Sequence, residues 1–269
     1  ERTSVREAKS RLMSTLEHIT FQDSKESDVK RENANIDGDT AMGTMLKYGS
    51  ESAKDYYLTH LLPKDIADAH INGDIHIHDL DFYTLTLTCC QIDVLKLFHG
   101  GFSTGHGFLR EPNDIRSYAA LACIAIQADQ NDMHGGQAIP NFDFAMAEGV
   151  KKTYNKIFRN NIIKFIDFID GKNLESELKP YFKELYKSEI EPRYHDYDSQ
   201  NKVFGLLEEK YPELSWEKIK PFVIKDSEKE VEEQTHQAME ALVHNLNTMH
   251  SRAGAQVPFS SLNYGKKVA

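Results

Sequence analysis

The sequence predicts a helix-rich α/β fold, and three observations lead to this prediction. Most of the 269 residues lie in stretches where apolar side chains recur every three or four positions, as on one face of a helix. A few short stretches instead have the composition or the alternation of half-buried strands. The helical and strand-like stretches follow one another along the chain, which is typical of α/β architecture.

The N-terminal quarter is predicted to be helical. Residues 4–18 combine a capping-box spacing with apolar residues at helical intervals. A polar, turn-rich stretch follows over 22–38. A second helix is expected over 40–60, and a shorter one over 63–73, which starts at a proline and stops at an Asn-Gly pair.

Two strands are expected next. Over 74–79 isoleucine alternates with polar residues, so His76 and His78 would share one face of the strand. Residues 84–92, rich in Thr and Leu, form the second predicted strand. The two adjacent cysteines of this strand would point to opposite faces and are therefore not expected to form a disulfide with each other.

The rest of the chain is predicted to be mostly helical. A glycine-rich stretch at 100–107 is interpreted as a loop too flexible for a regular element, which could still bring backbone N–H groups near a phosphate. Beyond it we expect, in order, a helix over 113–130, a turn at 134–137, a helix over 143–169, charged surface helices over 170–228, a helix over 229–251 and a strand over 256–263.

Composition excludes several classes of protein. The net charge is −10, from 32 Lys and Arg against 42 Asp and Glu, so binding to nucleic acid is not expected. No stretch approaches the ~20 apolar residues of a membrane span. Three cysteines do not make a disulfide framework, which favours a reducing, cytoplasmic compartment. The first residue is Glu1 and no signal peptide is visible, and we expect both ends to be cuts in a longer protein.

The His76-x-His78 pair allows three interpretations. Two imidazoles on one strand face can bind a divalent metal, as in a metal-dependent barrel hydrolase, but further ligands at later strand ends would be needed. The pair could instead hydrogen-bond a polar substrate. It could also form a structural network with Asp79 and Asp81.

The cysteines are also ambiguous on composition alone. Cys89 and Cys90 could be half of a zinc site, a nucleophile or a redox thiol, although no second Cys pair accompanies them. Cys123 lies among alanines in a predicted helix and is interpreted as a structural residue.

Several longer motifs, taken together and in order, resemble the anaerobic (class III) ribonucleoside-triphosphate reductases. The similarity covers nearly the whole chain and is least secure over 170–228. The motifs are Asn35-Ile36-Asp37-Gly38-Asp39-Thr40, His76-Ile77-His78-Asp79-Leu80-Asp81, Thr88-Cys89-Cys90-Gln91-Ile92-Asp93, Gly100-Gly101-Phe102-x-x-Gly105, His134-Gly135-Gly136-Gln137 and Ser251-Arg252-Ala253-Gly254-x-Gln256-x-Pro258-Phe259-Ser260-Ser261.

This resemblance implies a specific fold and chemistry. The fold would be the first half of a ten-stranded glycyl-radical-enzyme α/β barrel. The enzymes reduce ribonucleoside triphosphates to deoxyribonucleotides, with formate or a thioredoxin-type protein as reductant. The glycyl radical, installed by a radical S-adenosylmethionine activating enzyme, would lie downstream of this chain, as would the finger-loop cysteine. The ATP-binding cone would lie upstream of residue 1.

The resemblance also implies roles for individual residues. Cys89 corresponds to the early-strand cysteine that donates hydrogen as the 2′-hydroxyl leaves as water, with Cys90 as the fallback assignment. His76 and His78 would line the same cavity and orient formate or the leaving water. Further contacts are implied for the substrate by Thr88, Gln256 and Ser260, and for a dNTP or ATP effector by Glu111 and Lys156. Many relatives have Asn where this chain has Thr88.

The resulting hypothesis is a catalytic fragment that is inactive alone and homodimeric in the full protein. Its parts would be an N-terminal helical part over 1–73, barrel strands and helices over 74–169, a helical excursion over 170–228, and a helix with a barrel strand over 229–269. Three alternatives stay open: a metal-dependent barrel hydrolase, a formate-lyase relative, and a nucleotide-sensing dimerisation module.

Overall fold

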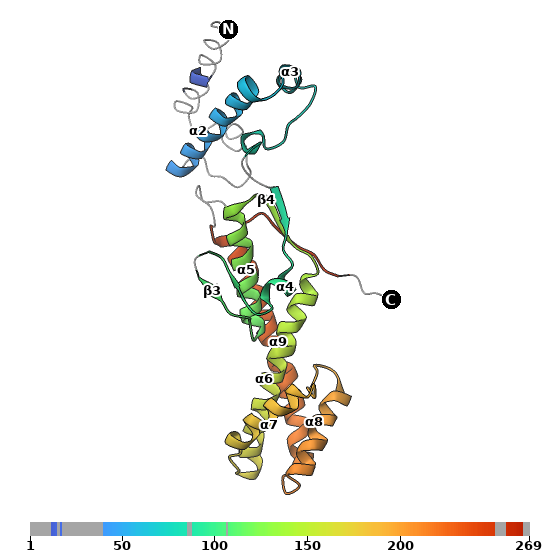
Figure 1. Cartoon of the computed structure of the whole chain (residues 1–269). Coiled ribbons are helices and arrows are strands. Elements are labelled where there is room, and N and C mark those ends of the chain that lie inside the picture. The colour runs from blue at the N-terminus through green and yellow to red at the C-terminus, as the bar shows by residue number, and fades with distance from the viewer. Residues whose placement is uncertain are drawn as a thin grey trace. The chain divides into compact units, whose positions relative to one another are not determined.

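The computed structural model describes residues 12–14, 17, 40–84, 88–105, 107–250 and 257–265. The predicted helix over 4–18 and the polar stretch over 22–38 therefore lie almost entirely outside the described residues. The elements, shown in Figure 1, are α2 (Ala41–Tyr56), the π-helix η1 (Tyr57–Leu61), α3 (Lys64–Asn72), the 3-10 helix η2 (Leu80–Phe82), β1 (Thr88–Gln91), α4 (Val94–Phe98), β2 (Phe102–Ser103), β3 (Phe108–Leu109), α5 (Ile115–Asp132), β4 (His134–Ile139), α6 (Phe142–Asp170), α7 (Glu175–Lys187), α8 (Tyr197–Lys210), α9 (Trp216–Thr248) and β5 (Ser260–Leu262).

The chain divides into two compact units, each made of segments distant in sequence. The first unit comprises residues 1–90, 126–138 and 246–261. The second unit comprises residues 91–125, 139–245 and 262–269. The architecture is helix-rich α/β with a small parallel sheet, which confirms the predicted fold class at this level.

The helices predicted over 40–60 and 63–73 are present, the first as α2 continued by η1 and the second as α3. Thr40 caps α2, and its hydroxyl accepts a hydrogen bond from the Gly43 backbone N–H at 3.0 Å. Helix α3 follows Pro63 and ends at Gly73, which is left-handed with φ +82°. Glycine reaches this conformation without the steric penalty of a side chain, so the helix stops there.

The predicted strand over 74–79 is wrong. These residues form bends and a turn that leads into η2. The Ile77 N–H, which strand pairing would use, instead donates to Nδ1 of His70 at 3.1 Å. Asp79 is left-handed, with φ 49° and ψ 43°, and a strand cannot continue through that conformation.

A three-stranded sheet has the order β1-β4-β5. Strands β4 and β5 run parallel: the Gln137 N–H donates to the Phe259 carbonyl at 2.8 Å, and the Asn263 N–H donates to the Ile139 carbonyl at 3.0 Å. Of the strand predicted over 84–92, the structure shows Thr88–Gln91 as β1. Residues 85–87 lie outside the described residues, and Ile92 is not part of the strand.

The prediction of a turn at 134–137 is wrong, because these residues begin β4. The two glycines suggested a turn, but in the structure Gly135 allows close approach of the neighbouring strand, while Gly136 has room for a side chain. A Cβ on Gly135 would meet Cys89, and one on Gly136 would lie 3.6 Å from the Phe259 carbonyl. The last strand is shorter than predicted and covers Ser260–Leu262.

A short antiparallel hairpin, β2–β3, occupies the glycine-rich stretch in the second unit. Phe102 pairs with Leu109, and Ser103 pairs with Phe108. A Cβ on Gly101 would lie 2.4 Å from the Leu109 carbonyl, so only glycine fits there. The expectation that this stretch is too flexible for a regular element is therefore wrong.

Helices α5 and α6 form where predicted and pack closely in the second unit. The Ile115 N–H at the start of α5 donates to Oγ1 of Thr153 at 2.8 Å, and this hydroxyl donates to the Gly149 carbonyl at 2.8 Å. A Cβ on Gly149 would lie 2.9 Å from the Tyr118 ring. The two helices can approach because this position has no side chain.

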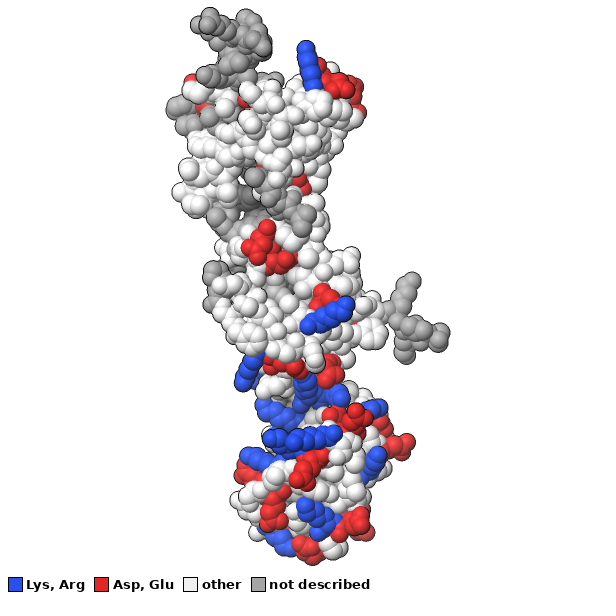
Figure 2. Space-filling model, viewed as in Figure 1, with Lys and Arg blue, Asp and Glu red and all other residues white. Residues whose placement is uncertain are grey.

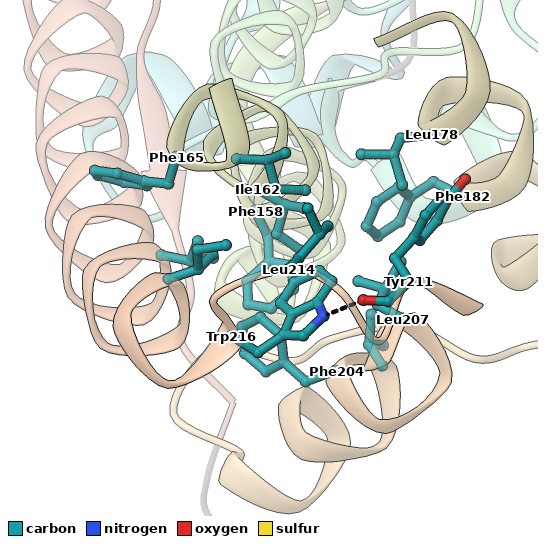
Figure 3. Close-up of a cluster of buried hydrophobic side chains, with 14 of the residues drawn as sticks. Phe158, Ile162, Phe165, Leu178, Phe182, Phe204, Leu207, Tyr211, Leu214 and Trp216 are labelled. Carbon is teal, nitrogen blue, oxygen red and sulfur yellow. Dashed lines mark hydrogen bonds between the residues drawn. The ribbon is translucent and has the colours of Figure 1, made fainter. Parts of the chain in front are cut away.

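The largest apolar cluster is formed by α6, α7, α8, α9 and the connection between α8 and α9 (Figure 3). The Trp216 indole N–H donates to the Tyr211 carbonyl at 2.9 Å inside it. Its fully buried members include Phe158, Ile162, Leu178, Phe182, Phe204 and Leu207. The helices predicted over 170–228 are present. They were expected on the surface, but together with α6 they enclose a buried apolar core.

Helix α9 begins at Trp216, and the predicted start at residue 229 is wrong. Trp216, Ile219 and Val223 are buried at helical spacing in its first turns. Charged residues between them face solvent, and Figure 2 shows Lys and Arg interspersed with Asp and Glu over this helical region. Because charged residues predominate in this stretch, the apolar face of the helix was not recognised from the sequence. None of the helices in the described residues is long and apolar enough to cross a membrane.

Candidate active site

Cys89 on β1 is the exposed thiol of the first unit. Its backbone is left-handed, with φ 57°, which is uncommon for a non-glycine residue and costs about 1–3 kcal/mol. Its sulfur lies 3.7 Å from Oγ1 of Thr88. A Cβ on Gly135 would lie 2.8 Å from this sulfur and 2.8 Å from the Thr88 hydroxyl. The thiol therefore occupies space that only a glycine leaves open.

The neighbouring Cys90 has different surroundings. It is half-buried, and burial raises the pKa of its thiol, with a further contribution from Asp129 on α5. Burial in turn raises the pKa of the Asp129 carboxyl. The two adjacent thiols are both free and do not form a disulfide. Because the Cys89 backbone departs from extended geometry, the alternation of side chains along a strand does not predict on which face of the sheet its thiol lies.

The histidines of the predicted His-x-His pair are both exposed, and neither lies in a strand. The ring centroids of His76 and His78 are 6.0 Å apart, and those of His70 and His76 are 5.7 Å apart. Nε2 of His78 lies 3.3 Å from Oδ2 of Asp79. The imidazoles are thus brought together by a turn and not by a shared strand face.

The sequence interpretation assigned His134 no role at the candidate site and placed it in a turn. His134 begins β4 and is 7% exposed. Its Nε2 lies 3.3 Å from the same Oδ2 of Asp79. Its ring stacks on Phe82, with centroids 4.4 Å apart and an interplanar angle of 13°. An imidazole directly before two glycines was the signal that could have identified it.

The structure offers no group of ligands for the metal site considered from the sequence. Within the described part of the chain, no three or more His, Cys, Asp or Glu residues are grouped so that they could hold a metal ion. His78 approaches one carboxylate, that of Asp79, and His76 lies beside the His78 ring. The geometry therefore offers no support for the hydrolase alternative.

The other predicted substrate contacts are only partly placed. Thr88 adjoins the Cys89 sulfur on β1. Ser260 is exposed on β5, next to Phe259, whose carbonyl accepts from the Gln137 N–H. Gln256 lies outside the described residues.

The predicted effector residues lie in the second unit and have separate partners. The Glu111 carboxylate accepts from the Gly100 N–H at 3.0 Å and from Nζ of Lys152 at 2.8 Å. These two hydrogen bonds, the Lys152 bond first, lower the pKa of Glu111 despite the opposing effect of burial. Lys156 instead lies 3.9 Å from Asp114. The acid and the lysine are near the same helix start without pairing with each other.

Comparison with known proteins agrees with the motifs and identifies the class. Residues 32–269 match the family model of the anaerobic ribonucleoside-triphosphate reductases, which is most of the chain. The chain therefore belongs to the anaerobic ribonucleoside-triphosphate reductase family.

Individual proteins similar to this chain are also anaerobic ribonucleoside-triphosphate reductases. The chain is 31% identical over 158 residues to the anaerobic ribonucleoside-triphosphate reductase of Salmonella typhimurium, and 30% identical over 158 residues to that of Escherichia coli. Each alignment covers 58% of this chain and 22% of the relative. The enzyme of Enterobacteria phage T4 is 28% identical over 131 residues, covering 48% of this chain and 22% of the phage protein. The matched stretch is thus about a fifth of each relative's length.

Proposed function

We propose that this chain is part of a cytoplasmic enzyme that reduces ribonucleoside triphosphates to deoxyribonucleotides by radical chemistry, and that it contributes the hydrogen-donating thiol. Its small sheet would be part of a ten-stranded barrel in the full-length protein. The parallel pairing of β4 and β5 supports this, since parallel strands occur in sheets covered by helices. Family membership supplies the class of reaction.

The observation that carries the proposal is the placement of Cys89. Its thiol is exposed and lies in the space left by Gly135, and its backbone is held in a costly left-handed conformation. Strain of this kind is kept where the surrounding structure determines it, and it is concentrated at functional sites. Cys123 shows the contrast: it is buried, its pKa is raised to about 11 by burial, and its sulfur faces the Leu242 carbonyl at 3.7 Å.

The chemistry assigned to Cys89 is a hydrogen-atom transfer. Replacing the 2′-hydroxyl of the ribose by hydrogen takes two electrons and two protons and releases one water. The S–H bond of Cys89 would break and give one hydrogen atom to the sugar carbon. The reductant, either formate or a thioredoxin-type protein, returns a hydrogen atom to the Cys89 sulfur and supplies the second electron, so both electrons come from it and Cys89 ends the cycle as a thiol; the proton that leaves with the hydroxyl as water comes from solvent. When the glycyl radical of the full-length protein is present, it supplies the oxidising equivalent that starts the reaction.

The partners follow from the same proposal. The full-length protein would be a homodimer, activated by a radical S-adenosylmethionine enzyme and regulated by dNTP or ATP. Glu111 and Lys156 remain the proposed effector contacts. Glu111 would have to exchange its present partner, Lys152, or bind the effector together with it.

The test compares two cysteine variants of the full-length protein. Cys89→Ala should still form the glycyl radical, measured by electron paramagnetic resonance, but should make no deoxynucleotide. Cys90→Ala is the matched control and should lose less activity, since its thiol faces Asp129. Normal turnover by Cys89→Ala would overturn the assignment. The 269-residue chain alone should show no reductase activity.

A further inference from the structure

One carboxylate oxygen in the first unit connects two imidazoles. Oδ2 of Asp79 lies 3.3 Å from Nε2 of His78 and 3.3 Å from Nε2 of His134. The two histidines differ in their access to water: the side chain of His78 is 83% exposed, whereas that of His134 is 9% exposed. Asp79 therefore joins a solvated imidazole to a buried one.

The Asp79 side chain is committed to these contacts. Asp79 stands at the N-cap position of η2, where an aspartate normally accepts a hydrogen bond from the helix backbone. It makes no such side-chain cap, and its backbone is left-handed. Aspartate adopts this conformation more readily than most residues, but it is still a strained one.

His134 is held with one ring nitrogen unused. Stacking on Phe82 fixes the ring, and Nε2 faces the Asp79 carboxylate. The other nitrogen, Nδ1, is buried and has no hydrogen-bond partner among the described residues. A buried polar atom without a partner is costly and calls for an explanation such as a ligand. Because the Asp79 carboxylate takes up Nε2 and orients the ring, Nδ1 is the nitrogen left to pass a proton to a bound group.

The other nearby ionisable groups have partners of their own. Oδ2 of Asp81 accepts from the Ser50 hydroxyl at 2.7 Å. The Asp129 carboxyl forms a side-chain hydrogen bond with Cys90. Cys89 lies against Gly135, the residue after His134. Asp79, with His78 beyond it, is thus the charged group that acts directly on the His134 ring.

We propose that Asp79 and His134 form the proton donor for the hydroxyl group that leaves the substrate at the Cys89 site. The step moves one proton and no electrons. The Nδ1–H bond of the His134 imidazolium breaks, the leaving hydroxyl gains this proton and departs as water, and the neutral imidazole keeps its Nε2–H toward Asp79. Nδ1 regains a proton from water after product leaves. The inference rests on the proposed function and adds a residue that it does not use.

The central test uses His134→Gln in the full-length protein. General acid catalysis is worth about 10²–10⁴-fold, so ribonucleotide reduction should fall by at least about 10²-fold while the glycyl radical content is unchanged. Asp79→Asn, which removes the carboxylate that faces Nε2 of His134, should slow ribonucleotide reduction as well and leave the glycyl radical content unchanged.

A substrate that needs no proton separates chemistry from structure. A 2′-chloro nucleotide loses chloride, which leaves as a stable anion. His134→Gln should therefore release chloride from this analogue at the wild-type rate. An equal loss of chloride release and ribonucleotide reduction would show that His134 only supports the structure, and it would overturn the proposal.

The two proposals fail separately. If Cys89→Ala is inactive but His134→Gln reduces ribonucleotides normally, the proton donor is wrong and the proposed function stands. If Cys89→Ala is fully active, the role of Cys89 is wrong. The control variant is His195→Gln in the second unit, where Nδ1 of an exposed histidine lies 3.3 Å from Glu228. It removes a comparable His–carboxylate pair and should leave the rate of ribonucleotide reduction unchanged.

Discussion

Gly135 leaves the space in which the thiol of Cys89 lies: a Cβ on this glycine would be 2.8 Å from the sulfur. Gly135 is also left-handed, with φ +86°, so a side chain there meets both a strained backbone and a clash. The pairing of a glycine on β4 with a cysteine on β1 makes the position of the thiol depend on a residue that carries no functional group.

Gly135→Ala should displace the Cys89 thiol and destabilise the fold by at least about 1–2 kcal/mol, because alanine in a left-handed conformation carries that cost before any clash. Differential scanning calorimetry and the rate of thiol alkylation would measure the two effects. Gly136→Ala is the control. A Cβ there meets only the Phe259 carbonyl at 3.6 Å, which is ordinary contact, so its melting temperature should change little.

The three cysteines should react with maleimide in the order Cys89, Cys90, Cys123 in the native protein. Cys89 is exposed, Cys90 is half-buried with a raised pKa, and Cys123 is buried with a pKa raised to about 11. Only the thiolate is nucleophilic, so the raised pKa values slow the second and third reactions further. Mass spectrometry of a labelling time course would show the order. Early labelling of Cys123 without denaturant would contradict it.

Thr153→Val should destabilise the second unit by about 1–3 kcal/mol. The substitution keeps the shape of the side chain but leaves the buried Ile115 N–H without its acceptor. Urea unfolding followed by circular dichroism would measure the change.

Gly205→Ala in α8 should have the opposite effect on stability. A Cβ there meets nothing within 4 Å, and alanine should stabilise the helix by up to about 1 kcal/mol.

The Glu111–Lys152 pair should make stability depend on pH in the acid range. The pKa of Glu111 is lowered from its ordinary value of 4.5, so the folded state favours the carboxylate. Its contribution is present above pH 4.5 and is lost as the pH falls through the lower folded value. Glu111 is 41% exposed, so the effect should stay below about 1 kcal/mol and shrink with salt. Urea unfolding of Glu111→Gln between pH 6 and pH 3 should show a flatter dependence than the wild type.

Helices with a continuous apolar face could be predicted from the sequence. Helix α6 is one example, because its buried residues recur at helical spacing over its whole length. The start of α9 was missed since Trp216, Ile219 and Val223 are separated by charged residues that dominate the composition. A local pattern records spacing, but it does not show which face another helix will cover.

The candidate site was predictable in part. The residues proposed to act around Cys89 lie in motifs whose resemblance to one family led to the correct class. The turn at His76-x-His78 was not predictable, because it depends on a left-handed Asp79 whose side chain is held by His134, 55 residues later in the sequence. A contact at that separation leaves no periodic signal.

The apolar cluster of α6–α9 has a consequence for local opening of the chain. Amide protons around Phe158 and Ile162 can exchange with solvent only when several buried side chains lose their contacts together, so they should exchange near the rate of global unfolding. Strand β1 has four residues, mostly exposed, and its amides should exchange through much smaller fluctuations. The thiols therefore lie in a segment that can open and close many times while the helical core remains folded.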